Sequence, residues 1–265
     1  MIEVVALAKQ FVAPQPRGLS FKQVPPRVVK AVQQVSFVAP DGHITGLLGP
    51  NGAGKTTTLR MLAALIAPDA GRMAVDGIDV VSRPREALAR MGMLSDARGL
   101  YPRLTARENI VYYGLLQGMD RDAASARAET LARMLEMRPL LDRRTDGFSQ
   151  GERMKTALAR SLVHDPPNIV LDEPTNGLDV LATRALREAL RFLRTPDGGR
   201  KCIVFSTHIM QEVQRLCDSV VVVSHGRSVA SGTVDELLAQ TAERDFEEAF
   251  VKLAFAEERA QGATA

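Results

Sequence analysis

The chain has 265 residues, of which 45% are hydrophobic and 25% are charged. That composition is typical of an ordinary globular protein, and the length suffices for one large α/β domain with a subdomain. The net charge of +3 comes without a dense block of lysine and arginine, so we expect no nucleic-acid partner.

Other classes are excluded by single features of the sequence. Cys202 and Cys217 stand in apolar or helical surroundings without metal-ligand spacing, so we expect reduced core residues of a cytosolic protein. The N-terminus lacks a basic segment followed by a long apolar run, so no signal peptide is expected. No stretch approaches about 18 uninterrupted apolar residues, so any role at a membrane requires a partner.

In chain order, residues 2–7 and 31–38 are predicted strands on either side of an irregular stretch. Residues 12–28 are predicted to form a surface loop, because prolines remove the N–H donors of a sheet ladder. The residues that break the pattern are Pro14, Pro16, Gly18, Pro25 and Pro26. The loop is either a plain insertion or a contact to a ligand or partner. A turn at 40–42 then leads into a short buried strand at 44–48.

The next segment, residues 49–57, has the sequence GPNGAGKTT and fits the pattern G-x-x-x-x-G-K-[ST]. A triphosphate needs several N–H donors aimed at one anion, and glycines let the backbone wrap that closely. We expect Lys55 to supply a point charge to the β- and γ-phosphates and Thr56 a hydroxyl to Mg²⁺. The nucleotide contacts are expected from Gly49, Pro50, Asn51, Gly52, Ala53, Gly54, Lys55, Thr56 and Thr57.

The same segment is followed by a predicted helix over 57–67, whose N-terminus would point at the phosphates. The alternative is a glycine-rich turn that only links the strand to the helix. No internal repeat is present, so one such nucleotide site is expected in the chain.

The middle of the chain is dominated by helical spacing from about residue 84 to residue 164, after a short predicted strand at 72–75. We predict a helical subdomain over approximately 95–165, inserted between the halves of an α/β core. Strands and helices then alternate again. The predicted strands are 168–171, 202–206, 220–223 and 227–230, the last two joined as a hairpin, and the predicted helices are 183–193 and 213–217.

The C-terminal part is predicted to hold a short helix from Asp235 and an amphipathic segment over 243–255. We divide the chain into a main domain, 1–238, and a helical tail, 239–265.

A second chemical motif follows the strand predicted at 168–171. In a parallel α/β sheet, acids at the carboxyl end of a strand lie beside the phosphate loop. Asp172 is expected to hold Mg²⁺, and Glu173 to accept a proton from an attacking water. The alternative is that two adjacent acids merely begin a helix.

Residues 148–152, FSQGE, resemble the LSGGQ signature of the ATP-binding subunits of ABC transporters, and the resemblance spans about residues 2–238. It implies a P-loop NTPase (RecA-like) core with an antiparallel β subdomain and an inserted α-helical subdomain. It also implies that two subunits pack head to tail. Ser149 and Gly151 of one subunit, at a helix start, would then cover the ATP held by the other.

Further positions match the same family. Asp179 resembles the residue of the loop that crosses the dimer interface, and His208, at the end of a strand, resembles the switch histidine that donates to the γ-phosphate. Phe11 resembles the aromatic residue that stacks on adenine. The other three histidines are expected to be solvated: His43, His164 and His225.

Two positions depart from the family. Asp96 stands where a glutamine is usual; an ionised aspartate donates no hydrogen bond but still ligates Mg²⁺, directly or through water. Glu152 places a negative charge near the opposing triphosphate, which weakens closure of the dimer unless Arg153 or Lys155 offsets it.

Three segments of the sequence resemble one branch of the family in particular. Residues 47–62, 99–109 and 162–179 are similar to the sodium-extruding exporter ATPases of the NatA type. That implies a peripheral subunit at the cytoplasmic face of the membrane, with a separate integral membrane permease, a second ATPase subunit, ATP and Mg²⁺. Residues 99–109 lie where family members receive the permease's coupling helix, and the same run predicts a helix N-cap at Thr105.

Two other functions stay open. A soluble ABC-type ATPase acting on ribosomes or nucleic acid usually carries two nucleotide domains or long coiled coils, and neither is found here. A non-catalytic, ATP-sensing regulator is disfavoured, because the acids and bases that hydrolysis needs are present.

Overall fold

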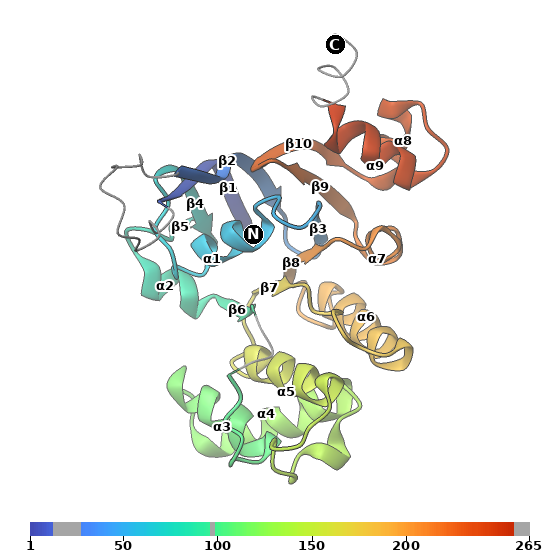
Figure 1. The fold of residues 1–265 in the computed structure, drawn as a ribbon. Helices are drawn as coiled ribbons and strands as arrows, with labels where there is room; N and C mark the ends of the chain where they lie inside the picture. Colours follow the sequence, from blue (N-terminus) through green and yellow to red (C-terminus); the bar gives the residue numbers. More distant parts are fainter. Residues whose placement is uncertain (13–27, 96–98, 257–265) are drawn as a thin grey trace, which may run out of the picture.

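A computed structural model describes residues 1–12, 28–95 and 99–256, which fold around one ten-stranded sheet (Figure 1). The strand order is β5-β4-β1-β2-β10-β9-β3-β8-β7-β6. Most of the predicted proline-rich loop, the magnesium candidate Asp96 and the end of the predicted tail lie outside the described residues.

One half of the sheet is parallel and buried on both faces. It comprises β9 (Ser219–Ser224), β3 (Ile44–Leu48), β8 (Cys202–Thr207), β7 (Asn168–Asp172) and β6 (Met91–Leu94). Strands covered on both faces have continuous apolar sequences, which is why β3 is buried along its whole length. Four of these strands, β9, β3, β8 and β7, are confirmed to within two residues of their predicted bounds, whereas β6 lies in the stretch for which helical spacing was predicted. Their carboxyl ends meet at one edge, where Leu48 pairs with Thr207 and Asp172 with Ser206.

The other half is antiparallel. It comprises β1 (Ile2–Val12), β2 (Val28–Ala39), β4 (Ala70–Val75) and β5 (Ile78–Asp79). β10 (Arg227–Gly232) pairs antiparallel with β9 and bridges to β2, joining the halves. β1 is longer than predicted, because register shifts between Val4 and Gln10 interrupt the alternation by which a strand is recognised. Ladder pairing continues to Val12 and Val28.

The helices inserted between β6 and β7 form a separate layer, seen at the bottom of Figure 1. They are α3 (Ala106–Leu116), α4 (Arg121–Met134), the 3₁₀ helix η1 (Arg138–Leu140) and α5 (Gln150–Leu162), which pack on a common apolar core. Thr105 caps α3 in a reciprocal box with Glu108, so the predicted N-cap is confirmed.

The helix after the phosphate loop, α1 (Lys55–Leu62), is shorter than the predicted 57–67. Ala64 adopts a left-handed φ of 53°, and the Leu65 N–H bonds back to the Arg60 carbonyl, which closes the helix early. α2 (Pro84–Ala89) precedes β6, and α6 (Val180–Arg194) and α7 (Met210–Leu216) flank β8.

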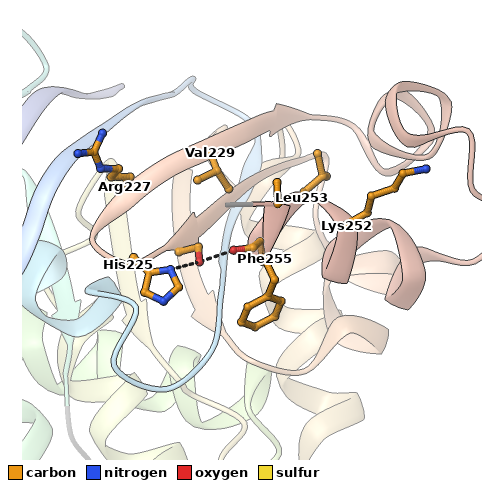
Figure 2. Close-up of a pocket in the computed structure, with 9 residues that line it drawn as sticks. His225, Arg227, Val229, Lys252, Leu253 and Phe255 are labelled. Carbon is orange, nitrogen blue, oxygen red and sulfur yellow. Dashed lines mark hydrogen bonds between the residues drawn. The ribbon is translucent and has the colours of Figure 1, made fainter. Parts of the chain in front are cut away.

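The C-terminal helices α8 (Val234–Thr241) and α9 (Phe246–Ala254) pack on the sheet. Phe246 and Phe250 of α9 are buried in a cluster with Val220 and Val222 of β9. The Ser224 hydroxyl donates to the Ala254 carbonyl at 2.6 Å and contacts His225 Nδ1, as Figure 2 shows. The pocket of about 310 Å³ drawn there, between β10 and α9, contains none of the predicted site residues. The domain boundary predicted at residue 238 falls inside α8.

The three histidines other than His208 differ in their exposure. His43 and His225 are exposed as predicted. The prediction for His164 is wrong: both ring nitrogens are buried, and neither makes a hydrogen bond of ordinary geometry within the described part of the chain. The ring lies beside the backbone of Met91, the first residue of β6, and its burial lowers the pKa of His164 below its ordinary value.

Replacing His164 with Leu is expected to reduce the loss of stability in mild acid. The folded-state pKa lies below the unfolded value of about 6.5, so the unfolded chain binds the proton first and stability falls as the pH drops below that value. Denaturant unfolding at pH values of about 7.5 and 5.5 measures the difference. An equal loss in both proteins would contradict this account. Asp165 and Lys201, the charged neighbours, are unchanged in both.

Candidate functional site

The phosphate loop connects β3 to α1 and is shaped by its glycines. Gly54 is the N-cap residue of α1 with a φ of 105°, in the left-handed region where a side chain is strained. A methyl group on Gly49 would lie 2.1 Å from the Val223 carbonyl oxygen of β9. The end of β9 is therefore packed directly against the loop. Just beyond β9, the Gly226 N–H donates to the Ala53 carbonyl of the loop at 2.9 Å.

Gly49→Ala is therefore expected to destabilise the fold by about 2 kcal/mol, the usual cost of forcing a methyl group into a packed site. The clash is with backbone, which no rotamer change relieves. Urea unfolding measures the change, with Gly52→Ala as the control for a loop glycine that has open space around it. A larger loss in Gly52→Ala would show that strain from its φ of 82°, and not the packing at Gly49, governs the loop.

Lys55 lies beneath the loop with a side chain only 4% exposed. Its ammonium donates to the carbonyls of Gly49 at 2.6 Å and Pro50 at 3.1 Å, and lies 3.9 Å from Glu173 Oε1. Burial lowers the pKa of Lys55, and the charges of Glu173 and Asp172 act in the opposite direction. A cation already withdrawn from water attracts an incoming anion more strongly than an exposed one.

Asp172 and Glu173, at the end of β7, are held by the neighbouring strand. The Ser206 hydroxyl of β8 donates to Asp172 Oδ1 at 2.6 Å and accepts from the Glu173 N–H at 3.0 Å. Thr56 Oγ1 donates to the same aspartate oxygen at 3.2 Å. His208 Nδ1 lies 3.2 Å from Glu173 Oε2. The structure thus gathers Lys55, Thr56, Asp172, Glu173 and His208 at the carboxyl edge of the sheet.

The donor set at this edge suits Mg²⁺. The Thr56 hydroxyl and the Asp172 carboxylate already lie together, and both supply the hard oxygen ligands that Mg²⁺ takes. The described residues contain no group of three or more His, Cys, Asp or Glu side chains that could hold a metal by themselves. Magnesium in nucleotide sites is normally held by one or two protein oxygens together with phosphates, so a two-ligand site fits it.

The predicted signature forms the start of α5. The Ser149 hydroxyl accepts from the Glu152 N–H at 3.2 Å, and the Glu152 carboxylate accepts from the Ser149 N–H at 2.8 Å, forming a capping box. The Ser149 N–H and then the Arg143 guanidinium, 3.0 Å away, lower the pKa of Glu152.

The cation that compensates the negative charge of Glu152 is Arg143, and not one of the two cations suggested by the sequence. Arg153 and Lys155 are the two cations that the sequence offers as a possible offset to Glu152, and they bond to the carbonyls of Phe148 and Glu136 instead. Arg153 is one residue along the helix from Glu152 and so does not share its face. Arg143 is brought to Glu152 by the chain that precedes α5, a contact that sequence spacing does not reveal.

Asp179 has a local role that the sequence analysis missed. Its carboxylate accepts from the Ala182 N–H at 2.7 Å and caps α6. The Gln150 side chain of the signature donates to the Asn176 carbonyl at 3.0 Å, which ties α5 to the loop leading to Asp179. Directly after Asp179, Val180 and Leu181 are 81% and 77% exposed.

Phe11 lies near the tip of β1 opposite Val29, with a side chain 39% exposed and the Lys9 ammonium 5.7 Å from the ring centroid. The facing strand β2 approaches the phosphate loop, because a methyl group on Gly54 would lie 2.6 Å from the Ala31 carbonyl oxygen. Phe11 therefore belongs to the antiparallel half of the sheet, whose strand β2 contacts the phosphate loop. Asp96, beyond the end of β6, lies outside the described residues.

No described helix is long and apolar enough to span a bilayer.

Comparisons with known proteins agree on one family. A family model described as ABC transporter matches residues 32–176, more than half of the chain. The ABC transporter ATP-binding protein NatA of Bacillus subtilis is 44% identical over 226 residues, which are 85% of this chain and 91% of the relative. The Nod factor export ATP-binding protein I of Burkholderia lata is 42% identical over 207 residues, 78% of this chain and 67% of the relative.

Solved structures agree. An ATP-binding subunit of an ABC transporter, 28% identical, superposes with a TM-score of 0.79 and covers 95% of this chain and 98% of its own. A dimeric bacterial ABC transporter cassette, 22% identical, superposes with a TM-score of 0.76, covering 88% of this chain and 98% of its own, and bears on the fold alone. The predicted fold class, a P-loop core with an antiparallel β subdomain and an inserted helical subdomain, is confirmed. The chain therefore belongs to the ABC transporter family, as an ATP-binding subunit that hydrolyses ATP.

Proposed function

We propose that this chain powers export through a separate integral membrane permease, by closing on Mg²⁺-ATP between two copies of itself and reopening after hydrolysis. The observation that carries the proposal is the cluster of Lys55, Glu173 and His208 beside the phosphate loop. The permease places the chain at the cytoplasmic face of the membrane.

Each residue of the cluster has a distinct task in the hydrolysis step. Backbone N–H groups of the non-proline residues in 49–57 and the Lys55 ammonium bind the phosphates. Glu173 accepts a proton from water as the water oxygen bonds to the γ-phosphorus. The bond from that phosphorus to the β–γ bridging oxygen breaks, and ADP keeps the bridging oxygen. His208, oriented by Glu173 at 3.2 Å, donates a hydrogen bond to the γ-phosphate.

The metal site is proposed on Thr56 and Asp172, with Asp96 as a further ligand on the sequence alone. When bound, Mg²⁺ supplies positive charge that neutralises the phosphate oxygens. Ser206 keeps the Asp172 carboxylate in place from the side of β8. Phe11 is proposed to stack on the adenine.

The second copy is proposed to complete the site. Among the described residues, no hydrogen bond or ion pair joins 148–152 to 49–57. The Ser149 hydroxyl accepts from the Glu152 N–H and still has its own proton to donate to a neighbour's phosphate. Arg143 neutralises Glu152, which removes the objection that this carboxylate repels the opposing triphosphate. The exposed Val180 and Leu181 beside Asp179 offer apolar surface that a second copy would cover.

A trapped dimer tests this proposal. Glu173→Gln is expected to double in mass from 28.8 kDa on addition of Mg²⁺-ATP, measured by light scattering after gel filtration. Adding Gly151→Asp to that variant should keep it monomeric, because the new carboxylate faces the partner's triphosphate. Gly151→Ala is the control, since a methyl group there meets only Leu178, at 3.8 Å. A dimer that forms equally well with Gly151→Asp would refute the composite site.

The permease and the cargo need their own test. Sodium is proposed as the cargo on the resemblance to NatA-type exporters, while the relative named for Nod factor export makes an organic cargo the competing outcome. Affinity purification from membranes identifies the permease, and ATP-dependent transport of radioactive sodium into vesicles holding that complex tests the ion. Co-purification with ribosomes, and not with a membrane protein, would contradict the exporter function and favour a soluble ATPase.

A further inference from the structure

A buried carboxylate next to the cluster is not used by the hydrolysis step described above. Glu212 lies in the first turn of α7 and is only 7% exposed. Its Oε2 accepts from the Thr175 hydroxyl at 2.7 Å, and the Thr207 hydroxyl lies 3.5 Å from the same oxygen. Both threonines are buried too.

The two threonines belong to the segments that carry the reacting groups. Thr175 follows Glu173 by two residues, and Thr207 directly precedes His208. Thr207 Oγ1 also accepts from the Ile209 N–H at 3.0 Å, so the hydroxyl spans the turn that contains His208. One carboxylate oxygen therefore touches the loop after Glu173 and the loop around His208 from a third element, α7.

Burying a carboxyl group is costly unless hydrogen bonds compensate for the lost water. Burial raises the pKa of Glu212, while the Thr175 hydroxyl, the Arg187 charge from α6, the Thr207 hydroxyl and the His208 imidazole act in the opposite direction. An apolar side chain would fill the same space without that cost. A carboxyl group at this position is therefore explained by what it holds in place.

Glu173 needs such support. Its φ is 47°, a left-handed conformation that a residue other than glycine keeps only when the surroundings impose it. Ser206 fixes the Glu173 N–H on the sheet side, through its hydroxyl at 3.0 Å and its carbonyl at 3.1 Å. On the far side, two side-chain bonds anchor the segment: the Thr175 hydroxyl donates to Glu212, and the Gln150 side chain donates to the Asn176 carbonyl.

We propose that Glu212 is a positioning residue of the ATPase site: it holds Thr175 and Thr207 together and thereby sets the contact between Glu173 and His208. The proposal rests on the roles assigned to that pair under the proposed function. Glu212 touches neither the nucleotide nor the water, and it acts only through the two segments it joins.

Steady-state ATPase kinetics of the full chain test it. Glu212→Ala is expected to lower kcat by about 10-fold, because small displacements of reacting groups are expensive, and to leave KM for ATP within about twofold. Glu212→Gln keeps an oxygen acceptor for Thr175 and should retain kcat within about threefold. Thr175→Val, which removes the donor, should match Glu212→Ala. Gln214→Ala, at an exposed position of the same helix, is the control.

A double-mutant cycle separates positioning from stability. With Glu173 already changed to Gln, Glu212→Ala should lower the residual rate by clearly less than about 10-fold, because one of the two groups that it positions has lost its function. An unchanged kcat in Glu212→Ala, or an equal loss with and without Glu173, would overturn the proposal. If Glu173→Gln itself hydrolysed ATP normally, the proposed role of Glu173 would fail instead, so the two failures are distinguishable.

Discussion

Replacing Glu173 with Gln is expected to leave ATP binding intact and to slow hydrolysis by about 10²–10⁴-fold, the usual size of a general-base effect. The amide has the same shape but does not accept the proton that water must lose. Its oxygen can still accept from His208 Nδ1, 3.2 Å from the carboxylate, so the position of the imidazole should be preserved. Phosphate release under saturating ATP and equilibrium binding of a fluorescent nucleotide give the two quantities.

The matched control is Glu188→Gln, at an exposed position of α6 where the carboxylate pairs with Arg184 at 2.9 Å. It makes the same chemical change on the surface and should hydrolyse ATP normally. If the Glu173→Gln protein hydrolysed ATP at the normal rate, the role of general base would have to be assigned to another group. A loss of binding equal to the loss of rate would make Glu173 a structural residue of the loop instead.

Replacing Lys55 with Met is expected to weaken ATP binding by roughly 3 kcal/mol, a factor on the order of 100, because a desolvated charge pair is lost. The free energy of unfolding of the nucleotide-free protein should rise or stay unchanged in the same variant. Lys55 is 4% exposed and its pKa is lowered by burial, so the free protein bears the cost of holding this charge out of water. Methionine fills the same space without that cost.

Nucleotide titration and thermal unfolding of the same samples separate the two effects. Arg60→Met, on the exposed side of α1, removes a cation of the same helix and should change neither quantity appreciably. If Lys55→Met lost binding and stability together, the lysine would be holding the loop through the Gly49 and Pro50 carbonyls, and the charge would not be acting on the phosphates.

Several features of the site follow from residues adjacent in sequence. A strand, a glycine-rich turn and a helix beginning at Lys55 require only local backbone geometry, so spacing alone located the phosphate loop. The same holds for Thr105, whose cap involves a residue three positions away. The acids at the end of β7 were placed correctly because a parallel sheet brings carboxyl ends together whichever strands are neighbours.

The residues that sequence analysis missed act across long separations. Ser206 supports Asp172 because β7 and β8 are adjacent in a particular register, and Arg143 offsets Glu152 because the chain folds back before α5. Glu212 meets Thr175 only when α7 packs beneath the loop after Glu173. A Ser before the Thr-His pair, or a Glu in a predicted helix, carries no local sign of such contacts.

The order of residues in this chain by itself determined the class of chemistry, since phosphate binding and proton transfer depend on short motifs whose geometry is local. Tertiary structure alone decided which side chains hold those motifs in place, how far β1 and β2 extend, and that the ring nitrogens of His164 are buried. The physical reason is the range of the interactions involved. Turns, caps and helix starts are specified within a few residues, whereas strand register and buried hydrogen bonds are specified by the whole folded chain.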